Sequence, residues 1–291
     1  MKPRDKVKKL LRATSKRWNV ILFLVLIVIA ALACTIRFYI FEPVVISDTS
    51  MTPAIPKGKR AWVCKLPYIK KHLQSGDFVL AKLKNGDLVL RKILAMPGDT
   101  VVLFPNGKAS VGDRSFKWYR ESEILDKREF YVPKKGDSIY FDSLNDISFD
   151  YASGYLHKKY GFRKYFVQAK LYQGNDSIPL SRVGSTRLAG RPISAKEVPG
   201  LPWQELYLIK LQIKKEEPGA KSIHFERKLF RRKDSTEVKT FVVDEDSYYL
   251  ICIKGDRCED SREFGYMPRS SITGKVIPIK LQFSFFKHFR I

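Results

Sequence analysis

The sequence has few of the residues that build small disulfide scaffolds and metal sites. Its 291 residues include only four Cys and no Cys-x-x-Cys pair, which excludes a disulfide-built fold. The four His lie far apart in sequence, at positions 72, 157, 224 and 288, so a zinc site of ordinary ligand spacing has no support. Hydrophobic residues make up 44% of the chain and aromatic residues 13%. That content excludes wholesale disorder and is sufficient for a packed core.

Acidic residues are also scarce relative to basic ones. There are 30 Asp and Glu against 54 Lys and Arg, a formal net charge of +24. Such an excess favours anionic partners, either lipid head groups or nucleic acid. The chain has no basic helix with heptads, no zinc-finger spacing and no aromatic RNA-binding consensus, so we expect no nucleic-acid partner. A protein that uses its charge only to bind a lipid surface is one alternative.

An uncharged apolar run near the N-terminus predicts a membrane anchor. Residues 19–36 carry no charge, and further apolar residues extend the segment to residue 41, close to the length of a bilayer-spanning helix. Residues 1–18 contain eight basic side chains and one acidic one. The positive-inside rule therefore predicts a cytoplasmic segment at 1–18, a span at 19–41 and an exterior domain from residue 42. The expected location is the cell membrane, which is the inner membrane where two are present.

Two other interpretations of this run are weaker. A cleaved signal peptide would fit the basic start, but the apolar run exceeds the usual ~7–15 residues. A core helix is also a poor match, because a helix that is apolar on every face over this length is unusual in a domain of this size. We therefore expect an uncleaved anchor.

The rest of the chain predicts a mainly β fold of antiparallel strands. Residues 78–83 alternate apolar and polar side chains, Asn85-Gly86 is a strong hairpin signal, and residues 88–94 form the returning strand. The best amphipathic helix is at 145–160. Further strands are expected at 100–104, 128–132, 165–171, 206–213, 240–243 and 248–253.

A stretch rich in charge and loop signals occupies the middle of the chain. We expect an inserted β-rich subdomain at 106–245, which interrupts a β core formed by residues 42–105 and 246–291. The basic cluster at 227–233 is interpreted most simply as a solvated hairpin, with contact to anionic lipid as the alternative.

Four motifs follow the anchor in a fixed order, and together they closely resemble the bacterial type I signal peptidases. The family pattern is Ser-Met-x-Pro, Gly-Asp, Lys-Arg before Pro-Gly-Asp, and Gly-Asp-Asn through Asp-Ser-Arg to Gly-x-x-Pro and Gly. The resemblance covers about 42–105 and 247–280, and the insertion only loosely. The matching residues here are Ser50-Met51-Thr52-Pro53, Gly76-Asp77, Arg91-Lys92 before Pro97-Gly98-Asp99, Gly255-Asp256, Asp260-Ser261-Arg262, Gly265 with Pro268, and Gly274.

The resemblance implies a membrane-anchored serine endopeptidase with a Ser–Lys dyad and no cofactor. It would remove signal peptides from exported preproteins at the outer face of the membrane. A Ser hydroxyl needs a base to take its proton, and a Lys can be that base only if burial lowers its pKa towards neutral.

Individual roles follow from the same match. Ser50 takes the place of the nucleophile and Met51 that of a membrane-facing apolar residue. Asp260 and Arg262 match a supporting ion pair beneath the site; without that context they would be interpreted as a weak surface pair. Gly76-Asp77 and Gly98-Asp99 are expected to mark turns.

Three departures concern the chemistry itself. Arg91 aligns with the base Lys, and Arg keeps its proton. Lys92 is adjacent, but neighbouring strand residues point to opposite faces. Asp48 stands where the family often has a group that aids the oxyanion hole, and its negative charge would oppose a developing oxyanion. The segment before Asp260 is shortened and lacks the family Ser that contacts the base.

The departures leave two functions open. One is a signal peptidase that uses Ser50 with Arg91 or Lys92. The other is a catalytically lapsed relative that binds signal peptides or assists a second, intact peptidase. Signal peptides and membrane lipid are the expected partners in both cases. The pairing of Cys64, Cys252 and Cys258 is also open, because no connectivity follows from sequence.

Overall fold

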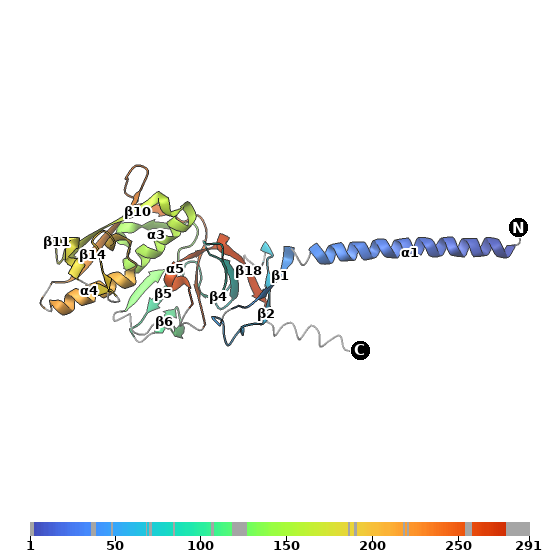
Figure 1. Cartoon of the computed structure of the whole chain (residues 1–291), viewed down its shortest axis with the longest axis horizontal. Coiled ribbons are helices and arrows are strands. Elements are labelled where there is room, and N and C mark those ends of the chain that lie inside the picture. The colour runs from blue at the N-terminus through green and yellow to red at the C-terminus, as the bar shows by residue number, and fades with distance from the viewer. Residues whose placement is uncertain are drawn as a thin grey trace.

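A long helix projects from a body of strands, as Figure 1 shows. Helix α1 (Pro3–Thr35) contains an 18-residue window, Trp18–Thr35, with mean hydropathy 2.6 and none of its residues buried. A core helix would be buried, so this finding excludes that alternative. The predicted span at 19–41 runs too far, because Phe41 already belongs to a strand. The computed structural model describes residues 3–35, 39–47, 49–67, 69, 72–83, 85–105, 108–117, 127–185, 187–188, 191–217, 219, 221–253 and 258–277.

The part of the body nearest α1 is a curled antiparallel sheet, built by strands from both ends of the chain that follows α1. Its strand order is β1-β2-β18-β3-β4-β16-β17. Because β18 lies between β2 and β3, and β16 lies beside β4, the two predicted halves of the core join in one sheet. The mainly β fold is therefore confirmed. The strands are β1 (Phe41–Val45), β2 (Arg60–Cys64), β3 (Phe78–Lys82), β4 (Leu88–Ala95), β16 (Ser247–Ile251), β17 (Met267–Pro268) and β18 (Ile272–Ile277).

The predicted hairpin at Asn85-Gly86 joins β3 to β4. Lys82 pairs with Leu88, and the register continues without a shift to the pair of Phe78 with Lys92. Regular pairing through this stretch fixes the face on which each β4 side chain lies.

A second, four-stranded sheet has the order β7-β6-β5-β8. Its strand β5 pairs with β6 across residue 105, the first boundary expected for the insertion. The division at 105 and 245 stays a prediction. Phe130 of this sheet packs in one cluster with Tyr249 of the first sheet and Tyr151 of the insertion. These strands are β5 (Thr100–Leu103), β6 (Lys108–Val111), β7 (Arg114–Lys117) and β8 (Arg128–Tyr131).

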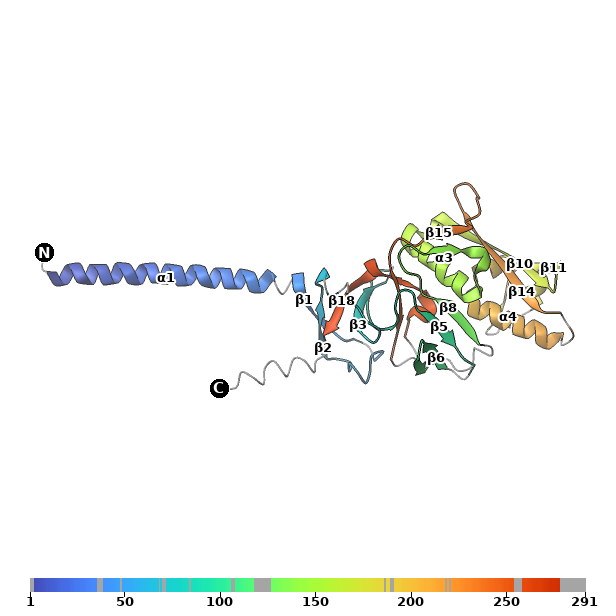
Figure 2. The same cartoon turned by 180° about the vertical axis from the view of Figure 1, so that it is seen from behind.

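The inserted part lies at the end of the body remote from α1, as both Figure 1 and Figure 2 show. Its centre is a three-stranded sheet, β11-β10-β14, whose inward side chains pack with those of α3 and α4. The elements are β9 (Ser138–Tyr140), α3 (Asp146–Tyr160), β10 (Tyr165–Gln173), β11 (Asp176–Ile178), β12 (Arg187–Leu188), β13 (Arg191–Pro192), α4 (Trp203–Glu216), β14 (Ile223–Arg231) and β15 (Thr240–Val242). The short helix α5 (Ser261–Phe264) lies between β16 and β17 of the core.

The predicted helix at 145–160 is confirmed as α3. Asn145 is its N-cap, and the side chain accepts a hydrogen bond from the backbone N–H of Ser148 at 2.9 Å. That bond satisfies one of the donors that a helix leaves unpaired at its start.

The strand predicted at 206–213 is wrong, because these residues form most of helix α4. Short apolar runs fit both a strand and a buried helix. The buried positions resolve the ambiguity, because they recur at intervals of three and four residues, the period of a helix face. They are Trp203, Leu206, Tyr207, Ile209 and Ile213.

The prediction that the basic cluster at 227–233 is solvated is wrong for Arg227. Arg227 is 8% exposed and points inward from β14. Its guanidinium pairs with the carboxylate of Asp150, donates to the backbone oxygen of Asp146 at 2.7 Å, and lies 4.5 Å from the ring centre of Phe149. Asp150 also accepts from the N–H of Trp203 at 2.5 Å. One buried ion pair therefore joins β14, α3 and α4.

Replacement of Asp150 should destabilise the protein. The variant Asp150→Ala leaves the Arg227 guanidinium buried without its closest carboxylate, and the expected loss is ~3 kcal/mol in the free energy of unfolding. Denaturant unfolding of the full chain in detergent measures it. Asp176→Ala is the matched control, because Asp176 and its partner Lys221 are 75% and 72% exposed. Equal effects of the two substitutions would contradict the assigned role of Asp150.

Candidate active site

Ser50 lies in the turn that follows β1, and its side chain is only 5% exposed. Its backbone oxygen accepts a hydrogen bond from the N–H of Ile253 at 2.9 Å. The next residue, Met51, is fully buried in a cluster with Leu80 and Cys252. The expectation that Met51 faces the membrane is therefore wrong: this side chain anchors the turn that carries Ser50 on the core.

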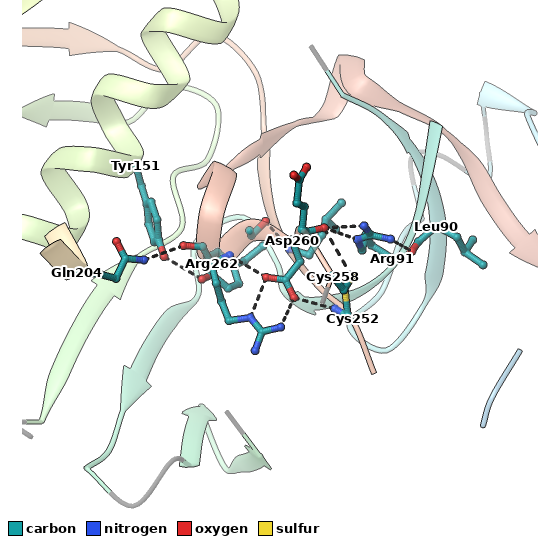
Figure 3. Close-up of polar contacts among 12 residues, drawn as sticks. Leu90, Arg91, Tyr151, Gln204, Cys252, Cys258, Asp260 and Arg262 are labelled. Atoms are coloured by element: carbon teal, nitrogen blue, oxygen red, sulfur yellow. Dashed lines mark hydrogen bonds and ion pairs between the residues drawn. A yellow bond between two sulfur atoms is a disulfide. The ribbon is translucent and has the colours of Figure 1, made fainter. Parts of the chain in front are cut away.

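Arg91 is buried in β4 with 3% of its surface exposed. Its guanidinium donates to two backbone oxygens, that of Glu259 at 2.8 and 2.6 Å and that of Leu90 at 2.6 Å. Figure 3 shows this fork bridging β4 and the segment that precedes Asp260. A planar cation with several fixed donors suits two carbonyl oxygens, whereas an ammonium group would not span them in the same way.

Lys92 occupies the other face of β4. It stands opposite Phe78 on β3 and Ile251 on β16, and its side chain is half-buried. The pairing of β3 with β4 has no bulge at this point. The prediction that Arg91 and Lys92 point to opposite faces is therefore confirmed.

Asp260 and Arg262 form the predicted ion pair, and it is buried. The two residues are 0% and 5% exposed, so a surface pair is excluded. The guanidinium of Arg262 donates from two nitrogens to the carboxylate, at 2.8 and 2.6 Å. Asp260 also accepts from the backbone N–H groups of Cys252 and Arg262, both at 3.0 Å. Burial acts to lower the pKa of Arg262, but the contact with Asp260 outweighs it and the pKa is raised.

A disulfide between Cys252 and Cys258, whose Cα atoms are 6.5 Å apart, closes the same segment. The pairing that the sequence left open is thus settled, and Cys64 remains a buried free thiol. Ile253, which contacts Ser50, follows one sulfur-bearing residue, and Glu259, which contacts Arg91, follows the other. The turn of Ser50 and the side chain of Arg91 are therefore held by one cross-linked segment.

Two motif glycines are explained by packing. Gly265 has φ of +71°, and a Cβ there would lie 2.9 Å from the Tyr151 ring. A Cβ on Gly274 would lie 2.6 Å from the Val63 side chain and 2.5 Å from the Cys64 oxygen. Neither position accepts a side chain without movement of its neighbours.

The two Gly-Asp pairs form turns, as expected. Gly76 and Gly98 have φ of +94° and +92°, a region that favours glycine. The carboxylates of Asp77 and Asp99 accept from backbone N–H groups three residues earlier, at 2.8 Å in each case. These residues shape the turns of the core.

Contacts from the insertion also hold the site, and sequence reasoning missed them. Lys158 of α3 donates to the backbone oxygens of Phe264 and Tyr266. Gln204 of α4 donates to the backbone oxygen of Arg262 at 3.2 Å, as Figure 3 shows. Each acceptor is a backbone oxygen, which every residue has, so the sequence carries no signal for the contact.

A pair of tyrosines completes the link between insertion and core. The hydroxyls of Tyr151 and Tyr249 lie 3.0 Å apart, and both residues are buried. Burial raises the pKa of both hydroxyls, so they stay neutral and share a hydrogen bond.

Several expected site residues lie outside the described residues, namely Asp48, Gly255 and Asp256. Among the residues that are described, no group of three or more His, Cys, Asp or Glu side chains could hold a metal ion.

Comparisons with known proteins agree with this geometry. The family model "Signal peptidase, peptidase S26" matches residues 17–152. Signal peptidase I of Aquifex aeolicus is 26% identical over 262 residues, which cover 88% of this chain and 81% of that protein. Signal peptidase I of Buchnera aphidicola is also 26% identical over 262 residues, covering 83% and 70%. Signal peptidase I of Bacillus licheniformis is 33% identical over 105 residues, covering 33% and 56%.

The long matches run through the insertion, and the family match begins inside α1 and includes both Ser50 and Arg91. The apolar helix agrees with the predicted anchor, and the antiparallel sheet agrees with the predicted mainly β fold. The chain is therefore similar to the type I signal peptidases of family S26 over most of its length, as a divergent relative of those enzymes.

Proposed function

We propose that this protein is a serine endopeptidase that removes signal peptides from exported preproteins, with Ser50 as its nucleophile. The observation that carries the proposal is the segment closed by the Cys252–Cys258 disulfide, because it contacts both Ser50 and Arg91. The buried ion pair of Asp260 and Arg262 follows this segment directly and stabilises it. Preorganised groups of this kind are what a nucleophile needs for attack in a fixed direction.

In this reaction the Ser50 oxygen attacks the carbonyl carbon of the scissile bond. Its proton passes to a base and then to the leaving amine, and water later hydrolyses the acyl-enzyme. Arg91 takes the position of the family base but remains a cation, bound to the oxygens of Glu259 and Leu90. We propose that it holds the segment in place and that turnover is slow. Asp48 would oppose the oxyanion and slow it further.

The proposed substrate is bound where lipid and exterior meet. Helix α1 spans the membrane with residues 1–18 in the cytoplasm, because these residues carry eight of the nine basic side chains in the first 41 residues. Signal peptides reach the site from the lipid. If the native chain does not cleave, the remaining function is that of a signal-peptide binder beside a second peptidase.

Substitution of the nucleophile should abolish cleavage. Ser50→Ala removes the attacking oxygen, so preprotein processing by the purified chain should fall to the uncatalysed level while the unfolding midpoint stays the same. Thr49→Ala is the matched control, because it removes an exposed hydroxyl one residue away. Activity of Ser50→Ala near that of the control would remove Ser50 from the mechanism.

Exchange of the two basic residues on β4 should raise activity. In Arg91→Lys with Lys92→Arg, the residue beside Glu259 can lose its proton, and a general base is worth ~10²–10⁴-fold in rate. Single-turnover cleavage of a preprotein measures the gain, and Lys92→Arg alone should not produce it. If the native chain cleaves efficiently and Lys92→Ala alone stops it, Lys92 is the base and the proposed role of Arg91 fails.

Reporter fusions test the proposed orientation of the chain in the membrane. A reporter that is active only after export, fused behind Ile291, should be active in the full-length fusion. A fusion with the basic side chains of 1–18 replaced by Gln should lose part of that activity, because the charge asymmetry sets the orientation. Activity of a cytoplasm-dependent reporter at the same position would overturn the assignment.

A further inference from the structure

A groove of about 1200 Å³ lies between the insertion and the core. Helix α3 and residues 196–204 form one side, and residues 259–271 form the other. Ser50 does not line it. The lining mixes apolar side chains with charged ones, a combination that suits a polypeptide better than a small polar molecule.

The groove carries an excess of positive charge. Seven Lys and Arg side chains line it against four Asp and Glu. Two of the acids are engaged: Asp150 pairs with Arg227, and Glu245 with Lys159. By contrast, Lys82, Lys196 and Arg232 are exposed, and no ion pair ties them to an acid in the part of the chain that the structure describes. The groove therefore offers cations to an acidic ligand.

One end of the groove is part of the candidate active site. Glu259 and Arg262 both line it, and these residues contact Arg91 and Asp260. From there its lining continues along α3 and residues 196–204 of the insertion, which lies at the end of the body remote from α1 (Figure 1). The apolar part of a signal peptide belongs to the lipid near α1, so a chain that crosses the site continues towards the groove.

We propose that this groove binds the stretch of preprotein that follows the cleavage site and prefers acidic residues there. The inference rests on the proposed function. Its occupant is the exported polypeptide and not a lipid surface, because the insertion is the part of the body most distant from the membrane helix. Lys82, Lys196 and Arg232 determine the preference and are remote from bond cleavage itself.

Peptide binding to the full chain in detergent tests this inference without need of turnover. The probes are fluorescent peptides with an Ala-x-Ala cleavage sequence, followed by a stretch rich in Glu, in Gln or in Lys. The Glu peptide should bind about tenfold more tightly than the Lys peptide, with the Gln peptide between them, and the difference should shrink in ~1 M salt. Equal affinities for the three peptides would overturn the proposal.

A matched pair of variants locates the effect. The triple variant Lys82→Glu, Lys196→Glu, Arg232→Glu should lose the preference for Glu. The control Lys214→Glu, Lys215→Glu, Lys239→Glu makes the same change in charge at exposed positions outside the groove and should keep it. The same loss of preference in both variants would show that the effect comes from the net charge of the protein and not from the groove, and would overturn the proposal.

Preprotein cleavage distinguishes a failure of the groove proposal from a failure of the proposed peptidase activity. If the chain cleaves preproteins with no dependence on charge beyond the cleavage site and no effect of the groove variant, the groove proposal fails and the peptidase stands. If no cleavage occurs while the groove variant abolishes charge-dependent binding, the groove stands and the peptidase fails. Vesicles with phosphatidylserine should bind both triple variants alike, and selective loss in the groove variant would assign the groove to lipid.

Discussion

The buried pair of Asp260 and Arg262 is the interaction on which the arrangement of the site depends. Two charges removed from water cost several kcal/mol each unless every polar atom finds a partner. Here the carboxylate receives the guanidinium fork and two backbone N–H groups. Since one of those N–H groups is that of Cys252, the charge pair fixes the strand end against which Ser50 rests. Satisfaction of a buried charge thus helps to fix the position of Ser50.

The guanidinium of Arg91 joins β4 to the segment that precedes Asp260. A buried Lys can lose its proton, because desolvation favours its neutral form. An Arg at the same place cannot, but it offers a fixed fork of donors and joins two carbonyl oxygens. Backbone oxygens of Glu259 and Leu90 accept from this buried cation, which offsets part of the cost of removing it from water.

Local signals in the sequence were sufficient for the hairpin at Asn85-Gly86 and for the capped helix α3, since each depends on neighbouring residues. They failed for α4, because its run of apolar residues fits both the period of a strand and that of a helix. They also failed for Arg227, because its partners lie some 80 residues away in sequence. The motifs identified the buried pair of Asp260 and Arg262. The backbone acceptors of Arg91, Lys158 and Gln204 had no signature, because any residue can supply a carbonyl oxygen.

The position of β18 between β2 and β3 has a consequence for synthesis. Residues 272–277 follow every other strand of this sheet in sequence, yet they lie in its middle, so β2 and β3 have no partner for their facing edges until β18 has been made. Pairing over such sequence separation is slow. The core sheet can therefore close only after all of its strands have left the ribosome.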